Sequence, residues 1–195
     1  MAELPPRKRI EDAELLRALS HPLRSALLHH LTAVGPRTAS ECAEAVGSTA
    51  SNCSWHLRQL AQYGLVERAE GEDGRERPWR ARQVGLELGE LADDPVQRAA
   101  QLGVVGATLG HEQELTQRYL DSLDGLDPAW RAASGLSTYA LRVSPAELTR
   151  LVEAIDALVR PYVSAIRTDA PPDARPAHLG LRAFPRIDHT GKAEE

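Results

Sequence analysis

Apolar residues recur at three- and four-residue spacing in four consecutive segments at the start of the chain, which predicts four helices. We expect these helices within residues 11–19, 23–33, 38–46 and 47–64. Thr38 and Glu41 have the spacing of a capping box at the start of the third helix. Gly47 can end that helix in a left-handed conformation, and Ser48 or Thr49 can cap the next one. Two short helices joined by such a turn are typical of a helix-turn-helix.

The segment 47–64 divides into two faces. Cys53, Leu57 and Leu60 give it a buried stripe, and no acidic residue occurs between Gly47 and Gly64. The other face carries small, hydroxyl, aromatic and basic side chains, namely Ala50, Ser51, Ser54, Trp55 and Arg58. Such a face can lie against a polyanion without repulsion. Taken alone, the pattern also fits an ordinary amphipathic helix with a polar outer face.

The residues after Gly64 predict a β-hairpin. Two short strands are expected at 65–69 and 78–82, around a charged tip that contains Gly71 and Gly74. The return side of the hairpin carries four arginines, Arg75, Arg77, Arg80 and Arg82. These side chains can contact phosphate or the minor groove, or they can pair with the acids of the hairpin, Glu70, Glu72, Asp73 and Glu76.

A long helix is expected over residues 94–123, with Asp94 as its cap and Pro95 in its first turn. One face of this helix is made of small residues, Ala99, Gly103, Gly106, Ala107 and Gly110. A glycine inside a helix costs about 1 kcal/mol relative to alanine, so three of them call for a reason. Close approach of a partner helix is one reason, and a break of the helix near Gly103–Gly106 is the alternative.

The last third of the chain predicts a strand, a helix and a second strand. Side chains alternate over 138–143, Ser144 and Glu147 form a second capping box, and Pro161 should kink or end the helix that follows. A final strand is expected at 178–184. Four of the few aromatic residues lie here, Trp130, Tyr139, Tyr162 and Phe184. They can form core or dimer interface, or they can line an effector pocket.

Composition limits the class of protein. The chain has 195 residues, of which 42% are hydrophobic, and it has neither a long apolar run nor an N-terminal apolar segment, so we expect no membrane span and no secretory signal. Two cysteines form no disulfide framework, and a cytoplasmic location is the default. Residues 1–9 are expected to be disordered, or to act as a basic arm on phosphate.

The net charge of −5 argues against a general nucleic-acid coat, but the charge is unevenly distributed. Residues 1–85 carry 12 basic and 11 acidic groups, whereas residues 86–195 carry 11 and 17. The expected helix-turn-helix therefore lies in the near-neutral part. The chain contains no nucleophile elbow, P-loop or dinucleotide fingerprint, so we predict neither an enzyme nor a cofactor.

Residues 15–82 resemble the ArsR-type winged-helix repressors. The resemblance is carried by ALSHPLRSALLHHL, by TASECAEAVGSTASNCSWHLRQLAQYGLVERAEG and by GRERPWRA, with the local signature Ser54-x-His56-Leu57-x-x-Leu60. It implies a homodimer that binds double-stranded DNA, with paired recognition helices in successive major grooves and hairpin wings on the flanking backbone. It also implies repression that an effector relieves.

The resemblance places DNA-facing positions on the fourth helix and on the wing. These are Thr49, Ser51, Asn52, Ser54, Trp55 and Arg58 on the helix, and Arg75, Arg77 and Arg80 on the wing. Trp55 departs from the basic residue frequent there. Its ring can contact a thymine methyl or a sugar, or it can pack against a neighbouring helix. His56 and Leu57 are expected to be packing positions.

Many members of that family sense metals, but the matching ligands are absent here. Thr38 and Ser40 occupy the two thiolate positions of one family site. His111 and Glu114 match part of a second site, whereas Arg98 and Ala100 stand where its upstream ligands should be. Hydroxyl groups are poor ligands for soft metals. We therefore predict no metal site and a non-metal, possible small-molecule effector.

Together these observations predict a mainly α, α+β fold. It comprises a winged helix-turn-helix domain at 10–85, a dimerisation helix at 94–123 and a strand-helix-strand region at 136–186 that serves as dimer interface or effector pocket. The function predicted is a homodimeric repressor at an inverted-repeat operator. The alternative is a winged-helix protein-interaction module that does not read DNA.

Overall fold

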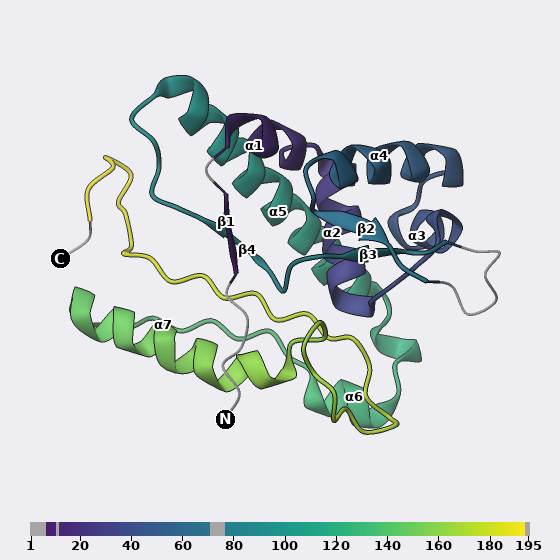
Figure 1. Cartoon of the computed structure of the whole chain (residues 1–195). Helices are drawn as coiled ribbons and strands as arrows, with labels where there is room; N and C mark the ends of the chain where they lie inside the picture. The colour runs from purple at the N-terminus through teal and green to yellow at the C-terminus, as the bar shows by residue number, and fades with distance from the viewer. Residues whose placement is uncertain (1–6, 11, 71–76, 194–195) are drawn as a thin grey trace.

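The structure is a computed structural model that describes residues 7–10, 12–70 and 77–193. Its N-terminal part is a bundle of four helices with a two-stranded hairpin beside it (Figure 1). The elements are α1 (Ala13–Leu19), α2 (Pro22–Val34), α3 (Ala39–Val46), α4 (Ala50–Gln62), β2 (Val66–Arg68) and β3 (Trp79–Ala81). The long helix α5 (Pro95–Asp121) packs across α1 and α2. The mainly helical fold with an N-terminal winged helix-turn-helix is thus confirmed.

One hydrophobic core holds the N-terminal domain and the start of α5 together. Its fully buried side chains come from every helix of the bundle and from the hairpin, and they include Leu16, Leu19, Leu27, Leu31, Cys42, Cys53, Leu57, Leu60, Leu65 and Val66. Val104 joins this core from α5. The apolar stripe expected on α4 is therefore the face that anchors it to α2 and α3.

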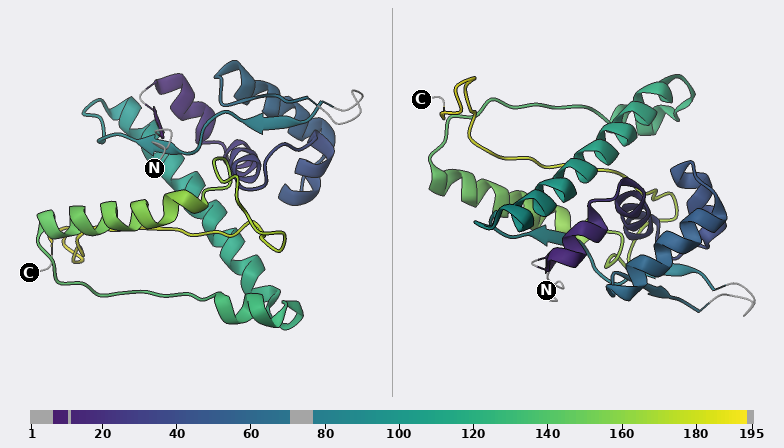
Figure 2. Two further views of the ribbon diagram at one scale, coloured as in Figure 1. Left: turned by 60° about the horizontal axis from the view of Figure 1, so that its bottom comes forward. Right: turned by 90° about the horizontal axis from the view of Figure 1, so that it is seen from above.

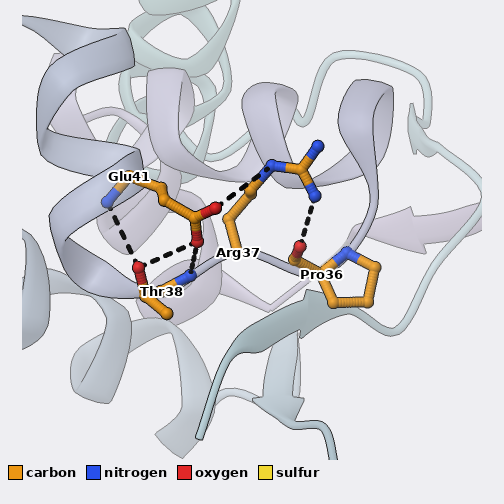
Figure 3. A network of polar contacts seen from close by, with 4 residues as sticks. All are labelled: Pro36, Arg37, Thr38 and Glu41. Carbon is orange, nitrogen blue, oxygen red and sulfur yellow. Dashed lines mark hydrogen bonds and ion pairs between the residues drawn. The ribbon is translucent and has the colours of Figure 1, made fainter. Parts of the chain in front are cut away.

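Short-range hydrogen bonds and one glycine define where α3 begins and how the turn between α3 and α4 is formed. The Glu41 carboxylate accepts hydrogen bonds from the Thr38 backbone N–H (2.7 Å) and hydroxyl (2.8 Å), and the Thr38 hydroxyl accepts from the Glu41 N–H (Figure 3). Gly47 has φ 65° and ψ 44°, the left-handed conformation that suits a glycine at a helix end. Thr49 then caps α4 by accepting from the Asn52 N–H. The predicted box and cap are both present.

Two short sheets flank the bundle. In the hairpin β2 and β3 are antiparallel, with Glu67 opposite Arg80, and Arg37 makes a bridge to Trp79 on the other edge of β3. The second sheet is parallel and pairs β1 (Lys8–Ile10) with β4 (Leu86–Leu88). The disordered start expected for residues 1–9 is therefore wrong for Lys8 and Arg9, whereas residues 1–6 lie outside the described residues, and β4 lies in a segment for which no strand was predicted. Segments of three residues are too short to show periodicity, and Ile10, which is 1% exposed, holds β1 in the core.

The helix α5 runs unbroken through its glycines, so the alternative of a break near Gly103–Gly106 does not hold. Asp94 caps it and Pro95 is its first residue, as expected. After it come two short helices that were not predicted from the sequence, η1 (Leu123–Gly125) and α6 (Pro128–Ala133). No helix among the described residues is both long and apolar enough to cross a membrane.

The C-terminal region contains the expected helix but not the expected strands. The helix α7 (Pro145–Val159) begins with the predicted Ser144–Glu147 capping box and gives way to the 3-10 turn η2 (Arg160–Tyr162) at Pro161. Residues 138–143 and 178–184 are not strands, which corrects the strand-helix-strand expectation. Alternation makes a segment suitable for a sheet, but a strand needs a hydrogen-bonded neighbour, and neither segment has one within the described chain.

Candidate nucleic-acid interface

The outward face of α4 consists of the side chains expected there. Thr49, Ser51, Asn52 and Arg58 are exposed, and Ser54 is partly exposed. Cys53, His56, Leu57 and Leu60 are buried on the opposite face. Since the described helix carries no acidic side chain, its outer face offers only neutral hydrogen-bonding groups, an indole and one cation.

Two side chains of this face make contacts along their own helix. The Arg58 guanidinium donates to the Ser54 carbonyl (3.1 Å) and to the Ser54 hydroxyl (3.4 Å). The Asn52 amide donates to the Ser48 hydroxyl at 3.1 Å. These contacts are exposed, so exchange for contacts with a ligand costs little desolvation. Both groups can donate and are held over the first two turns of α4.

Trp55 lies beside a pair of histidines. Its side chain is 51% exposed and its ring meets His56 edge-on, with 4.7 Å between the ring centroids. The His56 ring in turn lies 4.5 Å from His21, the residue that precedes α2. The indole therefore presents an open face to solvent and does not pack into a neighbouring helix among the contacts described.

The two histidines are kept neutral by their surroundings. Burial is the main cause that lowers the pKa of His56, and the neighbouring His21 and Arg24 lower it further. Burial also lowers the pKa of His21, with Arg24 as the second cause. The Nδ1 atoms of both rings are buried without a hydrogen-bond partner in the described structure. This pair connects the start of α2 to the middle of α4, and it confirms that His56 is a packing position.

The wing arginines differ in their environment. Glu67 pairs with Arg80 (2.6 Å) and with Arg82 (3.2 Å), so both charges are partly compensated. Arg77 is exposed, and Arg75 lies outside the described residues. The alternative to nucleic-acid contact was pairing with acids of the hairpin, of which Glu72, Asp73 and Glu76 lie outside the described residues; among the described residues the partner is Glu67 on the preceding strand. Only the strand register, which places Glu67 opposite Arg80, reveals that partner.

Sequence reasoning missed Arg68. Its guanidinium lies 3.8 Å from the centroid of the Trp79 ring and donates to the Arg77 carbonyl. Arg68 and Trp79 are opposite one another in the hairpin register. A basic residue that ends one strand opposite an aromatic residue is the signal that would have identified it. Arg68 thus adds an exposed, oriented cation to the wing.

The small-residue face of α5 is used in two ways. A Cβ atom on Gly103 would lie 2.9 Å from the Ser20 Cβ, so Gly103 is needed for packing within the chain. Gly106 and Gly110 have nothing within 4 Å of such an atom. Ala99 is exposed and Ala107 partly so. Beside this face α5 exposes Leu102, Leu109 and Leu120, which sequence reasoning did not single out.

The four aromatic residues considered for an effector pocket do not line a described pocket. Tyr139, Tyr162 and Phe184 are 79%, 66% and 70% exposed. Trp130 is partly buried, with the Arg175 guanidinium 5.6 Å from its ring centroid. One shallow pocket is formed by α1, α2 and α4, and another lies between α5 and Arg182. Neither contains any of the four residues.

The two thiols are buried in the core. Burial raises the pKa of Cys42 to about 11, and it also raises the pKa of Cys53. Metal binding and nucleophilic attack need the thiolate, which such environments disfavour. Within the described ranges, no three His, Cys, Asp or Glu side chains are grouped so that they could hold a metal ion.

Comparison with known proteins places one segment in a domain family. Residues 19–69, from the end of α1 to just beyond β2, match the family model of a helix-turn-helix domain. No curated protein matches the chain.

Two of three similar solved structures are described as transcription regulators. A probable transcriptional regulator from Pseudomonas aeruginosa is 18% identical, with 74% of this chain and 89% of that chain covered and a TM-score of 0.31. A MarR family transcription regulator is 17% identical, with 81% and 84% covered and a TM-score of 0.31. A ZitR variant from Lactococcus lactis is 12% identical, with 71% and 73% covered and a TM-score of 0.30.

The domain match agrees with the geometry of α3, α4 and the hairpin. It does not separate the ArsR type from other winged-helix types. Residues 19–69 match a helix-turn-helix domain, and this match supports a DNA-binding transcriptional regulator.

Proposed function

We propose that the protein is a sequence-specific DNA-binding transcriptional regulator of the ArsR type, which acts in the cytoplasm as a homodimeric repressor. It binds an inverted-repeat operator and is released by a non-metal effector. The observation that carries the proposal is the exposed, acid-free face of α4, held in a capped helix-turn-helix whose segment matches a helix-turn-helix domain.

The groups on that face suit direct reading of bases in the major groove. Arg58 can donate two hydrogen bonds to a guanine, and Asn52 can both donate to and accept from an adenine. The exposed indole of Trp55 can contact a thymine methyl. Exposed hydroxyls at Ser51 and Thr49 can donate to phosphate oxygens. On the wing, the exposed side chains of Arg68 and Arg77 can contact the flanking DNA backbone.

A dimer would place two such faces on one side of the duplex. We assign this contact to α5, whose Leu102, Leu109 and Leu120 are exposed beside the open glycines Gly106 and Gly110. Exposed apolar residues next to glycines allow two helices to approach closely. Half-sites separated by about one helical turn follow from two-fold symmetry.

The test is a binding titration with the full chain. Fluorescence anisotropy should show tight binding to a duplex from the region upstream of the gene and weak binding to a random duplex of equal length. The logarithm of affinity should fall linearly with the logarithm of salt concentration, with a slope that reports the phosphates contacted. Equal affinity for both duplexes, or no binding, would contradict the proposal.

A second candidate is a winged-helix module that binds protein and not DNA. The pairing of Glu67 with both Arg80 and Arg82 favours it, because it removes two cations from the wing. This candidate predicts no salt-dependent binding to any duplex, so the same titration separates the two.

A further inference from the structure

The helix α7 has strong helix signals but no cover for its apolar face. Its capping box is complete, with the Ser144 N–H donating to the Glu147 carboxylate at 2.8 Å, and Pro145 occupies its first position. Yet none of its residues is buried. Leu151, Leu158 and Tyr162 recur at spacings of seven and four and form one exposed stripe, with Leu158 72% exposed. Among described elements α7 packs extensively only with the turn η2 that follows it.

Two extended segments, one before and one after this helix in the sequence, also leave apolar side chains exposed. Over 138–143 the alternating side chains Tyr139, Leu141 and Val143 are all exposed. Over 178–184 Arg182 pairs with Glu112 of α5, and Gly180 lies against the same carboxylate, whereas Leu179 and Leu181 are exposed. No backbone hydrogen bond among the described residues involves either segment. Each segment was predicted to be a strand but has no hydrogen-bonded neighbouring strand among the described residues.

Figures 1 and 2 show how these parts are placed. The helix α7 lies on the other side of α5 from α3 and α4, and the extended segments run along it. A helix of this length is marginal in water without a packed face. Open strand edges invite pairing with another chain, and large exposed apolar patches mark interaction sites. The region therefore has the elements of a two-layer α/β unit, but the elements of one chain do not cover one another.

We propose that α7 and the segments 138–143 and 178–184 form one α/β unit with the same elements of a second copy, with the segments pairing between chains. One copy supplies a helix and two extended segments that do not pair with each other, and even a paired two-stranded hairpin is marginally stable unless a helix or a third strand packs on it. Two copies supply two helices and four strands, which form a complete two-layer arrangement.

The surface available is of the size that a stable dimer requires. A specific interface buries about 800 Å² on each partner. An aromatic side chain buries about 150–250 Å² when covered, so the largely exposed Tyr139, Tyr162 and Phe184 would supply roughly half of that area. A small ligand or a lipid surface would cover side chains but leave the backbone of both segments unpaired, which favours a partner with strands of its own.

The unit would also couple assembly to the DNA-reading domain. Arg7 beside β1 pairs with Asp156 of α7 at 2.8 Å, and Arg182 pairs with Glu112 of α5. Each C-terminal region is thus tied to the bundle of its own chain. Pairing of two such regions would set the separation of two α4 helices without touching either one. This inference concerns a surface separate from α4 and does not depend on DNA binding.

The test compares Leu158→Glu with Ala157→Glu in the full chain. Both variants add one charge to neighbouring exposed positions, but Ala157 points about 100° away from Leu158 around the axis of α7 and lies outside the apolar stripe. Light scattering should give a dimer for the wild type and for Ala157→Glu, and a monomer or a dimer at least roughly ten-fold weaker for Leu158→Glu. Amide hydrogen exchange over 138–143 and 178–184 should be slow in both dimers and fast in Leu158→Glu.

Dilution of the wild type gives the same comparison without a substitution, should Leu158→Glu fail to fold. Exchange in the two segments should then rise as dimer is lost. A wild type that is monomeric at all concentrations overturns the proposal, as does a dimer in which both segments exchange as fast as an unfolded chain. A dimer of the second kind that binds DNA selectively would leave the proposed function intact and reject only this interface, whereas a protein that is always monomeric would contradict the proposed homodimer as well.

Discussion

At the residue scale, Arg58 is the cation best placed on α4 to read a base. Its guanidinium is exposed, and its hydrogen bonds among the described residues go to Ser54 of its own helix. We expect Arg58→Ala to weaken operator binding by about 1–3 kcal/mol, or roughly 5- to 150-fold, with a smaller effect on a random duplex. Anisotropy titrations on both duplexes measure the two effects.

Arg150→Ala is the matched control, since it removes one exposed positive charge from α7, away from α4. An equal loss in the two variants, or an equal loss on both duplexes, would show that Arg58 acts only through general electrostatic attraction.

The histidine pair beneath Trp55 predicts a pH dependence of stability. The pKa of His21 and that of His56 are lowered, mainly by burial, so between those values and about 6.5 the unfolded chain binds more protons than the folded one. The free energy of unfolding should therefore be fully present above about pH 6.5 and should fall as the pH is lowered toward the folded pKa values.

Thermal melts between about pH 7.5 and about pH 5, on either side of the reference pKa of His, test this. His56→Asn should make the profile shallower but not flat, because the pKa values of His21, His29, His30 and His111 are also lowered, that of His29 to about 4. The exposed His189 provides the control variant His189→Asn, which should leave the slope unchanged. A flat profile in the wild type would show that the pair titrates normally.

Rules that depend on a few neighbouring residues predicted the helix caps but missed the ion pairs between strands. Thr38, Asp94 and Ser144 act as caps in the structure because a cap depends only on the next three residues. The partners of Glu67 could not be found this way. They depend on the cross-strand register, which places Glu67 opposite Arg80 and which the pattern of one strand alone does not give.

At the scale of elements, substitutions at two glycines of α5 distinguish packing within the chain from packing between chains. Gly103→Ala should destabilise the fold, because the new Cβ would lie 2.9 Å from Ser20. Gly106→Ala meets open space in the chain and should stabilise the isolated helix by about 1 kcal/mol. If α5 pairs closely across the dimer, the same change should weaken dimerisation.

Denaturant unfolding and light scattering on the two variants resolve these effects. A Gly106→Ala variant that is more stable and dimerises as tightly as the wild type would show that this face of α5 is not the dimer contact. A Gly103→Ala variant of unchanged stability would show that α1 adjusts to the added methyl group.

Elements with long periodic patterns were predictable, and elements defined by a partner were not. The helices α2, α4, α5 and α7 follow from apolar spacing and caps within a few residues of their observed bounds. The parallel pair β1 and β4 was missed, because its strands are 75 residues or more apart and three residues long. Residues 138–143 and 178–184 were predicted as strands, the first from its alternating side chains, although a ladder also requires a neighbour that the described residues do not supply.

At the scale of the whole molecule, operator binding by a dimer depends on the distance between its two α4 helices more than on the position of α4 in one chain. The proposed dimer contacts through α5 and α7 both lie away from the α4 face, so they leave it free for DNA. A rigid dimer of this kind presents two reading helices in fixed relative orientation, and its preference for half-site spacing becomes a measurement of assembly.

An insertion of about 5 base pairs between the half-sites of an operator turns one half-site to the opposite side of the duplex, because a helical turn is about 10 base pairs. A dimer joined through α5 and α7 cannot then contact both, and its affinity should fall to that of a single half-site. An insertion of a full turn restores the side but not the distance, so a rigid dimer should still bind poorly, whereas domains joined flexibly would recover. Anisotropy on the three duplexes decides between them, and equal affinity for all would mean that the two α4 helices bind independently.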